Sequence, residues 1–225
     1  MGSPLERSSG ETAARIGETL RGNTEGRRFV VETYFGRRAR ATAFDSRQRE
    51  LIVGSLLGDA RLLKTTSGFC FRVHHGLGQR ALVDWKYTAL ANFVRTAPRE
   101  SGNGYYFRTV SHPWLAELRE QFYEDGKKIV PIELLESSLS ELGLAVWIMD
   151  DGAAEGKQLR INTQSFSVDE AEELCRFLRA KFGIEMTVNR DKAKPRLRCK
   201  AASMDRLRSI VRDHTIPDML YKLSL

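Results

Sequence analysis

Two stretches of the chain, residues 51–57 and 142–149, are apolar on every side of a helix. A helix without a polar face must be buried all round, so both are expected in the centre of the fold. The first is capped by Asp45 or Ser46 and stops at Gly58-Asp59, and the second stops at Asp150-Asp151. Each helix therefore ends on an acid.

The elements predicted around these helices follow one another in a similar order twice. The strands are expected at 61–65, 69–74, 105–110, 159–163, 184–189 and 196–200, and the other helices at 79–95, 113–123, 168–182 and 204–213. Asp59 and Asp151 are 92 residues apart, a suitable length for one unit of an internal duplication. We expect one half over residues 45–138 and a second over 139–225, with an ordered apolar tail from His214.

Residues 1–44 differ from both halves, because they contain eight arginines and no lysine. One short helix is predicted over Glu11–Arg21, with Ser9 as N-cap and Gly22 as the stop. Residues 9–22 resemble the short modular DNA-binding motif found with some nucleases, although an unrelated amphipathic helix explains the pattern nearly as well. We expect this arm to contribute an accessory DNA contact.

The composition is that of a water-soluble protein that favours polyanionic partners. Lys and Arg number 36 against 29 Asp and Glu, which gives a net charge of +7. No apolar run reaches 18 residues, and the start of the chain does not read as a secretory signal. The three cysteines are too few and too far apart for a disulfide framework or a structural zinc site.

The two terminal acids indicate a bound cation. A carboxylate is disfavoured at the C-terminal end of a helix, where the helix dipole is negative. Small residues at Gly54, Gly58 and Ala145 would let the two helices approach closely and bring Asp59 and Asp151 together. Paired carboxylate oxygens suit Mg²⁺, with Mn²⁺ or Ca²⁺ as substitutes in binding. Either acid alone would more often belong to a turn.

The segments Ile52-Val-Gly-Ser-Leu-Leu-Gly-Asp-Ala60 and Leu144-Ala-Val-Trp-Ile-Met-Asp-Asp-Gly152 resemble the two motifs of a single-chain LAGLIDADG homing endonuclease. The resemblance runs from about residue 46 to the C-terminus and includes residues 127–131, 162–166 and 216–223. It implies an α/β (α+β) fold of two pseudo-symmetric αββαββα halves. In such a fold the motif helices pack together, and the antiparallel sheets form a saddle over DNA.

The resemblance also implies roles for single residues. Asp59 and Asp151 fall on the metal-binding acid, and Gly58 and Asp150 fall where a backbone carbonyl can contribute, so the division of labour between Asp150 and Asp151 stays open. Lys128 and Lys222 match the basic residue beside each metal. They lie 69 and 71 residues after their acids. A lysine there could stabilise the charge of the transition state or help to polarise the attacking water.

Alternating polar positions predict the surface that meets DNA. Residues 192–200 place five basic side chains on one strand face, and such charges repel unless an anion lies across them. An edge strand protected by lysines is the alternative explanation. The candidate DNA-binding residues are Arg61, Lys64, Arg72, His74, Arg108, Gln158, Arg160, Asn162, Gln164, Lys192, Lys194, Arg196, Arg198 and Lys200.

We therefore expect an intron- or intein-encoded, metal-dependent endonuclease that acts as a monomer and hydrolyses both strands of a long double-stranded DNA site. The alternatives on the same fold are a maturase that binds intron RNA and a DNA-binding protein that has lost cleavage. We expect no membrane association, and an intracellular location where the host gene resides, in the cytoplasm or nucleoid or in an organelle.

Overall fold

The computed structural model describes residues 33–191 and 194–223. The chain divides into Met1–Val31 and Glu32–Leu225, and every described element belongs to the second unit. The helix predicted over Glu11–Arg21 lies outside the described residues. A helix that the pattern did not predict, α1 (Tyr34–Ala41), begins this unit, with the Thr33 side chain accepting a hydrogen bond from the Gly36 amide.

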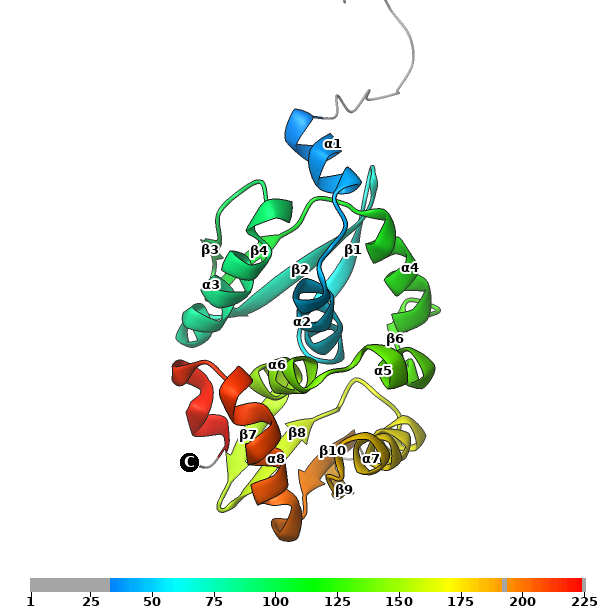
Figure 1. Ribbon diagram of the computed structural model, residues 1–225, viewed down its shortest axis with the longest axis vertical. Helices are drawn as coiled ribbons and strands as arrows, with labels where there is room; N and C mark the ends of the chain where they lie inside the picture. The colour runs from blue at the N-terminus through cyan, green and yellow to red at the C-terminus, as the bar shows by residue number, and fades with distance from the viewer. Residues whose placement is uncertain (1–32, 192–193, 224–225) are drawn as a thin grey trace, which may run out of the picture. The chain divides into compact units, whose positions relative to one another are not determined.

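The two apolar segments are the helices α2 (Ser46–Leu57) and α6 (Glu141–Asp151), and they lie side by side at the centre of the unit (Figure 1). Asp45 is the N-cap of α2 and forms a capping box with Gln48, which settles the choice between Asp45 and Ser46. Almost all residues of both helices beyond the first turn are buried, as predicted.

Close contact between the two helices depends on glycine. A Cβ atom at Gly54 would lie 2.2 Å from the carbonyl oxygen of Gly143, and one at Gly58 would lie 2.6 Å from the Cβ atom of Asp150. The close approach was predicted, but the residue facing Gly54 is Gly143 rather than Ala145. Side chains at either glycine would push the helices apart.

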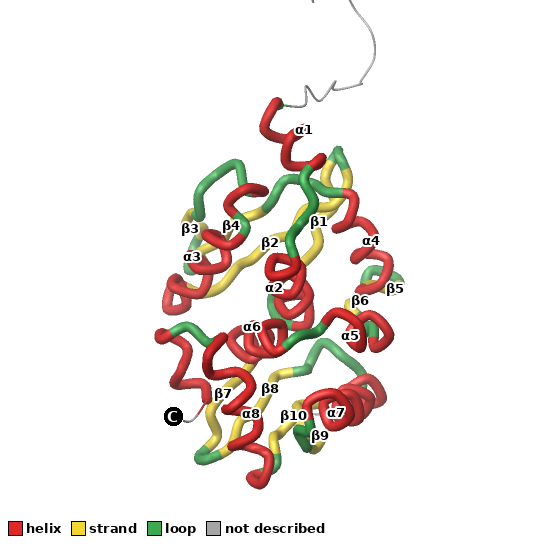
Figure 2. Tube along the Cα trace, in the orientation of Figure 1, coloured by secondary structure: helices red, strands yellow, loops and turns green. Residues whose placement is uncertain are grey.

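Each half builds one four-stranded antiparallel sheet in the described part of the chain (Figure 2). The first sheet has the order β1-β2-β4-β3, and the second has the matching order β7-β8-β10-β9. Their strands are β1 (Arg61–Thr65), β2 (Gly68–Gly76), β3 (Arg99–Ser101), β4 (Gly104–Arg108), β7 (Gly152–Glu155), β8 (Gln158–Asn162), β9 (Met186–Asp191) and β10 (Lys194–Cys199). Equal strand order confirms the predicted pseudo-symmetric halves.

Helices cover one face of each sheet, and the core lies between them. The helices α3 (Arg80–Ala89) and α4 (Pro113–Phe122) pack on the first sheet, and α7 (Val168–Phe182) packs on the second. The connections are a two-stranded hairpin, β5 (Tyr123–Glu124) with β6 (Lys127–Lys128), and the helix α5 (Ile132–Ser138). The helix α8 (Met204–Val211) and short 3₁₀ turns, including Pro217–Leu223, complete the second half.

The helix predicted over 79–95 is wrong in its second part, because α3 ends at Ala89. The Gln48 side chain donates a hydrogen bond to the Ala89 carbonyl and so satisfies the end of the helix. By leaving the helix there, the chain turns Leu90 and Phe93 into the core, where both are fully buried. The short elements β3, β5, β6, β7 and α5 were not predicted.

The apolar tail is ordered, as predicted, with Pro217–Leu223 in a 3₁₀ turn that buries Met219, Lys222 and Leu223. None of the helices in the described ranges is long and apolar enough to cross a membrane. The cysteines are free thiols in the structure, in agreement with the absence of a disulfide framework.

Candidate metal centre and nucleic-acid surface

The two predicted acids lie at the corresponding ends of α2 and α6. Asp59 follows Gly58, the C-cap of α2, and half of its side chain is exposed. Asp151 is the last residue of α6 and is half-buried. Because Gly58 packs against Asp150 across the helix pair, the residues that follow them are brought to a shared end of the interface.

Electrostatic repulsion marks this end of the interface. Burial, together with the negative charges of Asp59 and Asp150, raises the pKa of Asp151 to about 8, although Lys128 and Lys222 act in the opposite direction. A carboxyl group with such a pKa is destabilised in its charged form at neutral pH. A cation between the acids would remove that cost, and Asp59 and Asp151 are therefore suited to share or flank divalent ions.

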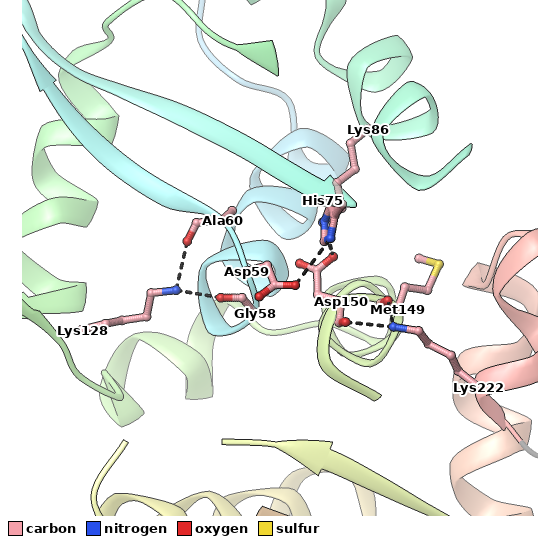
Figure 3. A network of polar contacts seen from close by, with 9 residues as sticks. All are labelled: Gly58, Asp59, Ala60, His75, Lys86, Lys128, Met149, Asp150 and Lys222. Carbon is pink, nitrogen blue, oxygen red and sulfur yellow. Dashed lines mark hydrogen bonds and ion pairs between the residues drawn. The ribbon is translucent and has the colours of Figure 1, made fainter. Parts of the chain in front are cut away.

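Lys128 and Lys222 occupy matching positions in the two halves (Figure 3). The ammonium of Lys128 donates to the carbonyls of Gly58 and Ala60, at 2.7 and 3.0 Å. That of Lys222 donates to the carbonyls of Met149 and Asp150, the latter at 2.8 Å. Each lysine thus holds the backbone next to one acid. Burial lowers the pKa of both lysines, that of Lys128 to about 8.

The carbonyls of Gly58 and Asp150 were predicted to contribute to metal binding, and each accepts one of these lysine hydrogen bonds. A carbonyl oxygen has two lone pairs, so each retains capacity for a second partner. The structure therefore brings together the acids, the two carbonyls and the two lysines of the predicted centre.

The side chain of Asp150 has a different role from that of Asp151. It is fully buried, and its Oδ1 accepts a hydrogen bond of 2.6 Å from Lys86 and lies 3.3 Å from Nε2 of His75. Although burial opposes the charged form, Lys86 and His75 hold the pKa of Asp150 down at about 2. Lys86 and His75 thus compensate the charge of Asp150, whereas the charged form of Asp151 stays disfavoured.

His75 and Lys86 were not predicted as site residues. His75 lies between Asp59 and Asp150, with Nδ1 3.5 Å from Oδ2 of Asp59 (Figure 3). Strand alternation contained the signal, because His75 is on the same face of β2 as buried Phe71 and Val73. Lys86 lies on the face of α3 that also buries Leu82 and Val83, and a lysine on such a face is the signal that could have identified it.

The first sheet places three predicted arginines directly opposite one another. The register pairs Arg61 with Arg72 on the neighbouring strand, and Arg72 with Arg108 on the next. Like charges in opposed positions are destabilising unless an anion lies across them. His74 is exposed on the same face, whereas the register of Lys64 with Phe69 places Lys64 on the other face, away from this row.

The second sheet repeats the pattern. Arg198 of β10 pairs with Arg160 of β8, and Arg196 pairs with Asn162. Glu155 lies within 3.6 Å of Arg160 and 3.3 Å of Arg198, so this pair is partly balanced within the protein. Leu159, Ile161, Leu197 and Cys199 are fully buried on the opposite face, as the alternation predicted.

The remaining predicted DNA-binding residues differ in exposure and in the contacts that their side chains make within the protein. Lys194 is exposed at the start of β10, and Gln164 lies in the turn after β8. Lys200 lies just beyond β10 and pairs with Glu185 at 2.7 Å, and the Gln158 amide donates to the Cys199 carbonyl. Lys192 lies outside the described residues.

The donor set for a metal is limited to the two acids and the adjacent carbonyls. Within residues 33–191 and 194–223, no three His, Cys, Asp or Glu side chains gather into a metal-binding group. Two carboxylates with carbonyl oxygens do not make a closed cage. They fit an ion that keeps part of its water shell and accepts phosphate oxygens, as Mg²⁺ does.

Comparisons with known proteins identify the family that the chain matches. Residues 49–207 match the LAGLIDADG DNA endonuclease family. The chain is 30% identical to the cytochrome b mRNA maturase bI2 of Debaryomyces hansenii, over 80% of this chain and 74% of the relative. It is 26% identical to the probable intron-encoded endonuclease 1 of Wickerhamomyces canadensis, over 81% of this chain and 86% of the relative.

Among solved structures, the homing endonuclease I-WcaI bound to its DNA recognition sequence has a similar fold. The TM-score is 0.77 at 24% identity, and the alignment covers 86% of this chain and 93% of the other. This match confirms the two-half architecture that the sequence predicted.

Proposed function

Because the chain belongs to the LAGLIDADG DNA endonuclease family, we propose that it is a site-specific endonuclease that cuts both strands of a long DNA site with divalent metal ions held by Asp59 and Asp151. The observation that carries the proposal is the matched pair of acids at one end of α2 and α6, each with a lysine on the carbonyl before it. Both acids come from one chain, so a monomer suffices.

The raised pKa of Asp151, caused by burial and by the negative charges of Asp59 and Asp150, supports a divalent ion between the acids. When bound, such an ion would act as a Lewis acid on the scissile phosphate and would favour the attacking water. Asp59 and Asp151 hold the ligand oxygens in place on two buried helices. Mg²⁺ is the expected ion, and Mn²⁺ or Ca²⁺ would occupy the same oxygen ligands.

Lys128 and Lys222 serve the reaction in two ways. Each fixes the backbone that carries one acid, and this keeps the two carboxylates at a defined separation. Each also brings a positive charge beside the acids, where negative charge develops on the phosphate in the transition state. Because the two lysines are equivalent by position, each is assigned to one half-site.

The arginine-bearing faces of the two sheets would bind the DNA. The row Arg61–Arg72–Arg108 and the pair Arg160–Arg198 carry like charges that an intervening phosphate backbone would stabilise. Half-buried Asn162, next to Arg196, has the amide that can read an adenine edge. Sheets from both halves would span a longer site than one sheet alone.

The test begins by selecting the cleavage site from a randomised library of DNA duplexes in Mg²⁺. Asp59→Asn and Asp151→Asn should each abolish or strongly reduce cleavage of the selected site, while binding to the same duplex in Ca²⁺ persists. Asp169→Asn, which changes an exposed acid on α7, is the matched control and should cut normally. Full cleavage by Asp151→Asn, or undiminished cleavage in EDTA, would contradict the proposal.

The maturase relative favours one second candidate, an activity that assists splicing of intron RNA. The same basic faces could bind RNA, and that activity would not need the metal centre. Splicing of a host intron by Asp59→Asn and Asp151→Asn proteins that no longer cut DNA would favour it. In either case we place the protein in the compartment of its host gene.

A further inference from the structure

The two halves of the metal centre are unequal in one respect, a buried polar network in which two side chains of the first half contact Asp150 of the second half (Figure 3). Lys86 of α3 and His75 of β2 both reach across to Asp150 on α6 of the second half. Lys86 has no exposed surface and His75 very little. His75 also faces Asp59, so the network connects a buried ion pair to one of the two candidate metal ligands.

The strand registers identify the residues at the equivalent positions of the second half. Arg61, two residues after Asp59, pairs with Arg72, and Ala153, two residues after Asp151, pairs with Arg160. His75 follows Arg72 by three residues, and Thr163 follows Arg160 by three. The equivalent of His75 is therefore Thr163, whose hydroxyl donates to the Pro195 carbonyl.

The same spacing continues into the next helix. Four residues separate His75 from α3, and four separate Thr163 from α7. Lys86 is the seventh residue of its helix, and the seventh residue of α7 is Leu174, which is fully buried. Asp150, before Asp151, corresponds to Gly58, before Asp59. The residues equivalent to Lys86, Asp150 and His75 are thus Leu174, Gly58 and Thr163.

Packing alone does not require the ionic network. Leu174 shows that the fold accepts an apolar side chain at the position of Lys86, and a buried ion pair is often no more stabilising than well-packed apolar residues. The network does fix geometry. Lys86 donates a hydrogen bond to Oδ1 of Asp150, Nε2 of His75 lies 3.3 Å from the same oxygen, and Nδ1 of His75 lies 3.5 Å from Oδ2 of Asp59.

We propose that Lys86, Asp150 and His75 form a one-sided positioning network that orients the Asp59 carboxylate and makes the two half-sites cut their DNA strands at different rates. His75 is the residue next to Asp59, and Lys86 acts through Asp150. The inference rests on the proposed endonuclease function. It goes further by assigning the roles of three buried residues and a strand asymmetry to this chain.

The experiment uses a supercoiled plasmid carrying the site selected by the full-length wild-type protein, with the two strands labelled separately. Rates of cutting of each strand are measured in Mg²⁺ for wild type, His75→Ala, His75→Gln and Lys86→Leu. His75→Ala should slow the strand cut at the Asp59 half-site by roughly tenfold to a hundredfold and leave the other strand unchanged, so that the ratio of the two rates departs from the wild-type ratio. His75→Gln keeps a polar side chain between the acids and should partly restore that strand.

A double variant separates positioning from folding. Lys86→Leu leaves the charge of Asp150 buried without its partner, so its melting temperature should fall. Lys86→Leu/Asp150→Ala removes both charges and should recover thermal stability. If the network has a positioning role, the ratio of the two strand-cutting rates in the double variant should still differ from the wild-type ratio. A purely structural role predicts that stability and strand balance recover together.

The matched control is His112→Ala, which removes another buried histidine that lies at the start of α4 and bonds to Thr42 and Trp114. It should reduce stability and slow both strands by the same factor. If His75→Ala also slows both strands equally, or leaves both unchanged, the inference is wrong while the endonuclease function stands. If the wild-type protein yields no cleaved site from the library, or cuts equally well in EDTA, the proposed function itself has failed.

Discussion

Replacing Gly54 by alanine tests whether close packing of α2 and α6 positions the metal centre. The added Cβ atom would lie 2.2 Å from the carbonyl oxygen of Gly143 and 2.8 Å from its carbonyl carbon and Cα atoms. All three atoms belong to the backbone of α6, so no side-chain rotation relieves the clash. The helices must separate locally by about 1 Å to reach ordinary van der Waals contact.

The expected cost has two opposing parts. Overpacking of a well-packed core costs about 1–3 kcal/mol, and contact with a helix backbone belongs at the upper end of that range. Alanine in place of glycine inside a helix returns up to about 1 kcal/mol. We expect a net loss of about 2 kcal/mol in the free energy of unfolding, which for a chain of this size lowers Tm by about 4–8 °C.

The same displacement would act on cleavage, because it moves Asp59 relative to Asp151. A misplacement of about 1 Å can cost roughly a hundredfold in rate. Unfolding in urea and single-turnover cleavage measured together test both effects, with Gly78→Ala as control, since a Cβ atom at Gly78 meets nothing within 4 Å. Wild-type stability and wild-type cleavage in Gly54→Ala would refute the packing argument.

Three further predictions concern the site and the DNA surface. Because the pKa of Asp151 is raised to about 8, the carboxyl group of Asp151 keeps its proton at neutral pH in the metal-free folded protein. Metal binding should therefore release about one proton per protein at pH 7, and metal affinity should rise with pH up to about 8. Calorimetry in buffers of different ionisation enthalpy measures both. Because the folded-state pKa of Asp151 is raised, this carboxyl group also makes the metal-free protein less stable as pH rises from about 4 to 8. A metal affinity that does not change with pH would contradict the assignment. Lys222→Met removes the donor to two carbonyls beside Asp151 and should slow cleavage strongly with little change in DNA affinity in Ca²⁺; equal loss of binding would argue for a DNA contact instead. Arg72→Ala should weaken DNA binding and reduce the salt dependence by about one ion, whereas exposed Arg212→Ala should not.

Local sequence pattern predicted the central helices and most strands because burial imposes a readable periodicity. The motif helices are apolar all round, and α7 is framed by a capping box at Ser167 and by Gly183 in the left-handed conformation, so the ends of α7 were predicted correctly. The pairing of acids also followed from the sequence, because a carboxylate at a buried helix C-terminus requires compensation. Strand alternation correctly placed Arg72, Arg160, Arg196 and Arg198 on polar faces.

The parts that were missed depend on contacts between distant residues. The end of α3 at Ala89 requires a side chain from Gln48, 41 residues earlier. Very short strands such as β7 have too few residues for a periodic signal, and they exist because a neighbouring strand supplies hydrogen bonds. Lys64 shows the same limit, since only the register with Phe69 reveals which face it occupies.

By itself, the sequence determined that two acids end two buried helices in a duplicated, basic protein, because hydrophobic periodicity and helix electrostatics act locally. Only the tertiary structure shows how the surroundings of Asp150 and Asp151 differ. The two residues are adjacent, so no argument from burial or dipole separates them, and their difference comes from Lys86, 64 residues from Asp150, and from His75. The partner that neutralises a buried charge is chosen by packing in three dimensions, and that choice leaves Asp151 with Asp59 as the proposed metal ligands.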